Sequence, residues 1–210
     1  MAQMPNAITV PTAPSTLEPT LASHLARQAA LVVAASVFVA ICAHISIPLV
    51  FTPVPLTMQN FAVLLLGLLM EPGAVFAALT LYLFEGASGL PVFTPHGPAG
   101  LLHLLGPNGG YLLAYPFIAA MTSLLARRIR PASFTTYAFS AAVASIFLYL
   151  CGTAWLEIAT HLPLATTLKM TVLPFLPGDA LKVFAAAAIA ISIIRLRKGS
   201  KVEHSSPSAG

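Results

Sequence analysis

The sequence predicts an all-α membrane protein, a bundle of six transmembrane helices with both termini in the cytoplasm. Three observations lead to this expectation: the composition, the length of the uncharged runs, and the placement of the basic residues. Of the 210 residues, 58% are hydrophobic and 8% are charged, whereas a soluble domain is about 45–50% apolar and about 25% charged. So little charge excludes a soluble globular domain, a disordered chain, a nucleic-acid-binding module and a coiled coil.

The uncharged runs predict where the helices lie. A helix needs about 20 apolar residues to cross a hydrocarbon core of about 30 Å, and residues 28–70, which contain no Asp, Glu, Lys or Arg, can hold two such helices. Prolines 48, 53 and 55 divide this run, because proline interrupts a helix. Similar breaks downstream complete the set of expected helices, at 28–48, 57–71, 73–89, 109–127, 133–157 and 178–196. A short interfacial helix is expected within 164–173.

The basic residues test the count and set the orientation. With six spans, eight of them fall on one side together with both termini, and Lys169 alone falls on the other. Because cytoplasmic loops carry the excess of Lys and Arg, this side is expected to be the cytoplasm. The eight residues are Arg27, Arg127, Arg128, Arg130, Arg195, Arg197, Lys198 and Lys201.

The chain is expected to hold one membrane domain, residues 27–197, between a polar N-terminal tail (1–26) and a polar C-terminal tail (198–210). Two connections on the outer side, 48–56 and 89–93, are unusually apolar for exposed loops. Such loops either close over a site as lids or pack against helix ends. The residues leave both interpretations open.

Ionisable side chains inside a membrane are costly and are therefore candidates for function. Asp179 and Lys182 are three positions apart and share one helix face. A helix dipole explains an N-terminal Asp, but Lys182 is followed by apolar residues and is poorly explained as a lysine that reaches outward, so a ligand site is favoured. Glu85 is a second candidate, whereas Glu157 is interpreted as lying at the headgroup boundary.

Other polar or glycine-rich groups fall at the same outer depth. Gln59 and Asn60 open one expected helix, and the segment 106–111 opens another, with backbone amides that could cap a polar group. Tyr82 lies one turn before Glu85 and either faces the same pocket or anchors the helix at the interface. Together these groups predict a small-molecule pocket that opens outward. The remaining aromatic and imidazole candidates are interpreted as packing or interfacial residues, with no metal site: His44, His103, Tyr149 and Trp155.

The first helix carries pairs of small residues four positions apart, Ala30 with Ala34 and Ser36 with Ala40. Small residues let helices approach closely, so this face predicts either a subunit contact or packing within the bundle. The sequence contains no Walker A motif for ATP hydrolysis and no nucleophile elbow or HExxH motif.

Five motifs, in order along residues 27–195, resemble the BioY family, the biotin-binding S components of energy-coupling factor (ECF) transporters. At Asn108 the family often has Thr, which alters a local hydrogen bond. The motifs are ISIPL (45–49), PVPLTMQ (53–59), YLFEGASGLPVF (82–93), GPNGGY (106–111) and PGDALK (177–182).

The resemblance implies a non-enzymatic biotin-capturing subunit, without cofactor or metal, in the lipid bilayer of a bacterial cytoplasmic membrane. It implies a transmembrane coupling protein and two ABC ATPases as partners, with the small-residue face of the first helix as the docking surface. It places the ligand at Asp179 and Lys182, where the lysine can neutralise the biotin carboxylate and the aspartate can accept ureido N–H groups or hold the lysine. The full set of expected ligand residues is Gln59, Tyr82, Glu85, Phe93, Thr94, Asn108, Gly109, Tyr111, Asp179 and Lys182.

Several alternatives remain at this point. An intramembrane enzyme could use Glu85, Glu157 and Asp179, although no pair of them has a known motif spacing. A self-sufficient proton-coupled carrier could use Glu85 as its proton site. Within the resemblance itself, the chain could carry biotin without partners, or bind another vitamin.

Overall fold

The computed structural model describes residues 21–203, and it describes side-chain surroundings for residues 21–197. The predicted tails therefore fall largely outside the described residues. Residues 21–26, assigned to the tail, instead begin the first helix. The elements of the described part are α1 (Leu21–His44), β1 (Ser46–Ile47), β2 (Leu56–Thr57), α2 (Gln59–Leu69), α3 (Pro72–Ala87), α4 (Leu101–Leu105), α5 (Gly109–Arg128), α6 (Phe134–Thr160), α7 (Leu164–Thr171) and α8 (Leu176–Glu203).

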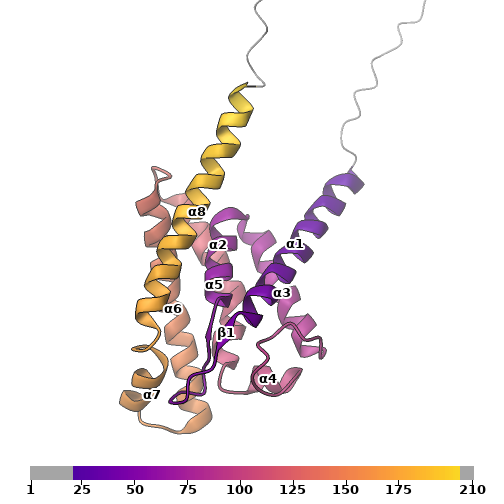
Figure 1. Cartoon of the computed structure of the whole chain (residues 1–210). Helices are drawn as coiled ribbons and strands as arrows, with labels where there is room; N and C mark the ends of the chain where they lie inside the picture. The colour runs from indigo at the N-terminus through magenta and orange to yellow at the C-terminus, as the bar shows by residue number, and fades with distance from the viewer. Residues whose placement is uncertain (1–20, 204–210) are drawn as a thin grey trace, which may run out of the picture.

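The helices form an up-and-down bundle with two distinct ends (Figure 1). The start of α1 and the end of α8 lie at one end, which we call the terminal end. The β1–β2 ribbon, α4 and α7 lie at the opposite end, which we call the pocket end. Of the described basic residues in helices, Lys169 in α7 lies at the pocket end, whereas Arg128 closes α5 at the terminal end.

A helix is present in each of the six ranges expected to span the membrane, as α1, α2, α3, α5, α6 and α8, and α7 matches the expected short helix within 164–173. The bounds differ most at the terminal end, where α1 begins at Leu21 rather than at 28 and α8 continues to Glu203 rather than ending at 196. At its other end α1 stops at His44 rather than at 48. The chain leaves the helix there because Ser46 and Ile47 pair antiparallel with Thr57 and Leu56. This ribbon and the five-residue α4 were not expected from the sequence, since a two-residue strand has no measurable periodicity.

The short helix α2 forms the centre of the bundle. Eight of its eleven residues are buried, and it packs against α1, α5 and α8. At 1.5 Å per residue, α2 is about 17 Å long and α3 about 24 Å, both shorter than a hydrocarbon core of about 30 Å. The chain at the pocket end of these two helices is therefore ribbon and loop, and this leaves room for a polar site.

Three of the described helices, α1, α5 and α6, are long and apolar enough to cross a membrane, and α2 and α3 are shorter apolar helices. The outward face of α1 exposes Leu31, Val37 and Ile41, each at least half accessible. Large exposed apolar side chains along a long helix are typical of a lipid-facing surface.

Candidate functional site

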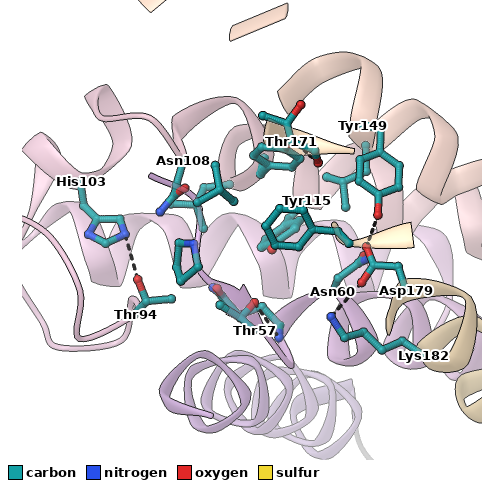
Figure 2. A pocket seen from close by; sticks show the side chains of 17 residues that line it. Thr57, Asn60, Thr94, His103, Asn108, Tyr115, Tyr149, Thr171, Asp179 and Lys182 are labelled. Atoms are coloured by element: carbon teal, nitrogen blue, oxygen red, sulfur yellow. Dashed lines mark hydrogen bonds and ion pairs between the residues drawn. The ribbon is translucent and has the colours of Figure 1, made fainter. Parts of the chain in front are cut away.

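A cavity of about 60 Å³ lies at the pocket end, between the central helices and the ribbon (Figure 2). Its lining comes from α2, α4, α5, α6, α7 and α8, and from the β1–β2 connection. Six of the ten expected ligand residues line it, and they combine acidic, basic, amide and hydroxyl groups. These six are Gln59, Thr94, Asn108, Tyr111, Asp179 and Lys182.

An ion pair between Asp179 and Lys182 forms one wall of the cavity. Lys182 Nζ lies 2.8 Å from Asp179 Oδ1, and each residue is only 8% exposed. The pair exists because both residues lie in the first two turns of α8, where positions three apart share a face. An isolated charge at this depth would be costly to bury, so each side chain compensates the charge of the other.

The second carboxylate oxygen of Asp179 accepts two further hydrogen bonds. Tyr149 donates its hydroxyl hydrogen to Oδ2 at 2.6 Å, and Asn60 donates from Nδ2 at 3.1 Å (Figure 2). Three helices, α2, α6 and α8, therefore converge on one carboxylate. Tyr149, expected from the sequence to be an anchor or packing residue, belongs instead to this hydrogen-bonded cluster.

The opposite wall is built around His103 of α4, which is 4% exposed. Its Nδ1 lies 2.8 Å from the carbonyl oxygen of Pro98, and a carbonyl only accepts, so Nδ1 carries a hydrogen. In the neutral ring Nε2 is then an acceptor, and it lies 3.4 Å from the hydroxyl of Thr94. The sequence predicted a packed or interfacial His103. The residue is indeed buried, but it also lines the cavity, which was not expected.

Aromatic side chains fill the space between the two walls. Tyr111 and Tyr115 of α5 line the cavity, and Tyr111 donates to the carbonyl oxygen of Thr171 at 3.5 Å. Figure 2 shows Tyr115 between the Thr94–His103 wall and the Asp179–Lys182 wall. The site therefore offers polar groups at two ends with rings between them, which suits a small molecule that is polar at both ends and apolar in the middle.

Four of the ten expected ligand residues do not line the cavity. Two of them, Tyr82 and Phe93, contact and position residues next to the lining. The Tyr82 hydroxyl receives a hydrogen bond from Gln59 Nε2 at 2.6 Å and donates to the Val92 carbonyl oxygen at 3.0 Å. The Phe93 ring packs so closely over Gly86 that a Cβ there would lie 2.0 Å from it. Both residues act as packing and positioning groups for Gln59 and the 92–94 segment.

Gly109 is the third residue outside the cavity lining. A Cβ at Gly109 would lie 1.9 Å from the Leu104 carbonyl oxygen, and one at Gly110 would lie 2.2 Å from the Trp155 side chain. Trp155 also donates from Nε1 to the Gly106 carbonyl oxygen at 2.9 Å. The glycines that open α5 therefore allow α4 and α6 to approach closely, a packing role that was not expected from the sequence.

Glu85, the fourth, lies on a different side of the bundle. Its carboxylate accepts a hydrogen bond from Ser36 of α1, and it lines an open apolar groove of about 500 Å³ together with Ile41, His44 and Leu90. Ser36, expected on a docking face, is thus fully buried between α1 and α3. Among the other small residues of that face, Ala30 and Ala34 are exposed and Ala40 is partly buried.

The two apolar connections differ in their roles. Val54 and Pro55 of the first connection line the cavity, whereas Phe93 of the second is buried in the core. The first connection therefore lies at the cavity, and the second packs against the bundle. Within residues 21–203 no group of three or more His, Cys, Asp or Glu side chains is placed to hold a metal ion.

Comparison with known proteins agrees with this architecture. A solved crystal structure of the S-component for biotin from an ECF-type ABC transporter superposes with a TM-score of 0.75 at 27% sequence identity, covering 83% of this chain and 93% of the other. A probable biotin transporter BioY from Bacillus subtilis (strain 168) is 35% identical over 68% of this chain and 76% of its own length. A second probable biotin transporter BioY, from Pyrococcus horikoshii, is 32% identical over 79% of this chain and 94% of its own length.

The relatives are transporters, so the intramembrane-enzyme hypothesis is not supported. Together with its apolar helices, the likeness makes the chain a multi-pass membrane protein. A model of the BioY family matches residues 11–199, nearly the whole length. The chain therefore belongs to the BioY family.

Proposed function

We propose that this protein captures biotin and takes part in its uptake as the substrate-binding S component of an ECF-type transporter. The observation that carries the proposal is the buried Asp179–Lys182 pair at a polar cavity in a chain of this family. A buried ion pair inside a membrane domain contributes little net stability, so ligand recognition is a better reason for its presence.

The chemistry of the cavity fits biotin, which has an apolar ring system and chain, a ureido group and a carboxylate. Lys182 has three ammonium hydrogens, of which one is directed to Asp179, so it retains donors for a carboxylate or a carbonyl. The contacts favour the holding role for Asp179, because both its oxygens are occupied. Gln59, Thr94 and Asn108 complete the polar set.

A cavity of about 60 Å³ is smaller than the roughly 300 Å³ or more of a typical ligand site. Biotin entry therefore requires a wall to move. The segment with Val54 and Pro55 is the best candidate, because it lines the cavity from a short ribbon rather than from a packed helix. This segment would act as the lid.

The proposed setting is a bacterial cytoplasmic membrane, crossed six times by α1, α2, α3, α5, α6 and α8. The terminal end, with the basic residues Arg27, Arg128 and Arg195, would face the cytoplasm, so the pocket end would face outward. A transmembrane coupling protein and two ABC ATPases would drive uptake. The exposed Ala30 and Ala34 on α1 support docking of the coupling protein at this helix.

The test is equilibrium biotin binding to the purified chain in detergent, with a vitamin panel as competitors. Tight binding that only biotin competes for, and that Asp179→Asn and Lys182→Ala both weaken at least tenfold, is the expected result. A folded wild-type chain that binds another vitamin instead would overturn the choice of ligand. Biotin uptake in cells with and without an ECF module separates S-component action from partner-independent transport.

A further inference from the structure

Two buried acceptors at the cavity have no partner among the described residues, Asn60 Oδ1 and Asn108 Oδ1, and of these Asn60 belongs to the side chain that is bonded to Asp179. Asn60 Oδ1 is fully enclosed and makes no hydrogen bond within residues 21–197, although Asn60 lines the cavity and is 94% buried, with 6% exposed. A buried polar atom without a partner costs about 1–3 kcal/mol. Such an atom inside a binding cavity is therefore a group available for a ligand.

The orientation of the Asn60 amide is set by Asp179. Turning the amide by 180° exchanges the positions of its oxygen and nitrogen. Only Nδ2 can donate to the Asp179 carboxylate, and it lies 3.1 Å from Asp179 Oδ2. The reverse orientation would bring two acceptors together. Asp179 thus keeps the amide oxygen turned away from itself, and Tyr149 and Lys182 hold Asp179 in place.

The same cluster leaves one acceptor and one donor next to each other. Asp179 has no free oxygen, since Lys182, Tyr149 and Asn60 use both. Asn60 Oδ1 is therefore the acceptor of this wall that has no partner among the described residues. Lys182 keeps spare hydrogens beside it, because both side chains bind the same carboxylate (Figure 2).

From this arrangement we propose that Asn60 is a specificity-determining residue whose amide oxygen accepts an N–H of the ligand, with Asp179 as its positioning residue. An acceptor beside a donor matches an N–H adjacent to a carbonyl, as in a cyclic urea. A carboxylate, which only accepts, would be repelled by Asn60 Oδ1. The inference rests on the proposed function, because it concerns the ureido ring of biotin.

The experiment pairs a change in the protein with a change in the ligand. Biotin and two analogues, methylated at one or the other ureido nitrogen, are titrated into the wild type, Asn60→Ala and Ser145→Ala. Ser145 on α6 is the matched control, because its hydroxyl is likewise buried and has no partner within residues 21–197, but it does not line the cavity. Thermal unfolding verifies that each variant is folded, and Asn60→Ser replaces Asn60→Ala if that variant does not fold.

Wild type is expected to lose at least tenfold in affinity for one methylated isomer, because its hydrogen bond to Asn60 is gone. Asn60→Ala is expected to bind biotin about tenfold more weakly and to discriminate less than threefold between biotin and that isomer, while Ser145→Ala matches wild type. If wild type and Asn60→Ala discriminate equally between biotin and each methylated isomer, the role of Asn60 is wrong, whereas the proposed function still stands. Failure of wild type to bind biotin would instead overturn the proposed function.

Discussion

Asp179 and Glu85 are two carboxylates in the apolar part of the same bundle, and their surroundings differ sharply. Asp179 is 8% exposed, pairs with Lys182, and accepts hydrogen bonds from Tyr149 and Asn60. Glu85 is partly exposed at an open apolar groove and accepts a hydrogen bond from Ser36. The first carboxylate organises three helices around a cavity, and the second links α1 to α3.

The difference shows why an acidic residue in an apolar segment is not by itself a site. A carboxylate at the surface of a bundle is screened by its surroundings and needs few partners. A carboxylate held away from solvent needs a cation and several donors, and those donors must come from other helices. Convergent donors around a cavity are therefore the feature that separates the two residues.

The largest effect is expected when the charge pair at Asp179 is broken. Lys182→Met leaves an uncompensated buried carboxylate, which should lower the free energy of unfolding by about 3–5 kcal/mol and abolish biotin binding. The double variant Lys182→Met with Asp179→Asn should recover most of the stability but not the binding. Thermal unfolding and calorimetric titration measure both quantities.

A double variant no more stable than Lys182→Met would contradict the assignment of that cost to an unpaired charge. Recovery of biotin binding in the double variant would show that the pair serves the fold and not the ligand.

A smaller effect is expected at Tyr149, which supplies one of the three partners. Tyr149→Phe removes a hydrogen bond to a charged group, worth about 1.5–3 kcal/mol, and should weaken biotin binding at least tenfold. Tyr137→Phe is the control, because Tyr137 is a buried tyrosine of the same helix, α6, that lies outside the cavity lining. Equal affinities for the two variants, measured by titration, would remove Tyr149 from the site.

The smallest effect is expected at Glu85. Glu85→Gln and Ser36→Ala should leave biotin affinity within about twofold of wild type and should lower stability by about 1 kcal/mol or less, since the group is partly exposed. Titration and thermal unfolding again provide the measurements. A tenfold loss of affinity or of uptake in Glu85→Gln would restore Glu85 as a candidate proton or ligand site.

Sequence reasoning located well those elements whose signal lies within a single segment of the chain. The apolar runs ended by prolines or basic clusters located six apolar helices, and the order of five motifs identified the family, which the family match confirms. The ribbon was missed because two-residue strands leave no pattern. Helix α4 was missed because five residues, Leu101–Leu105, are too few for one, and they follow a run of Gly and Pro.

The site was anticipated in part. Asp179 and Lys182 stood out because a lysine inside an apolar helix has no local explanation, and both line the cavity. Tyr82 and Glu85 belong to the motif at 82–93 but face neighbours outside the cavity lining. Asn60 was noted in the sequence as a polar residue beside Gln59 but was not included in the expected site. Its role depends on Asp179, which is 119 positions away in the sequence.

The sequence by itself determined that this chain is a membrane protein, where its helices begin and end approximately, and to which family it belongs. It also singled out Asp179 and Lys182 as candidate site residues. These properties depend on composition, on the spacing within single helices and on short motifs. Only the tertiary structure decided that Asn60, Tyr149 and His103 join the cavity, and that Glu85 does not. The reason is physical: hydrogen-bond satisfaction of a buried group depends on which helices meet around it, and no single segment contains that information.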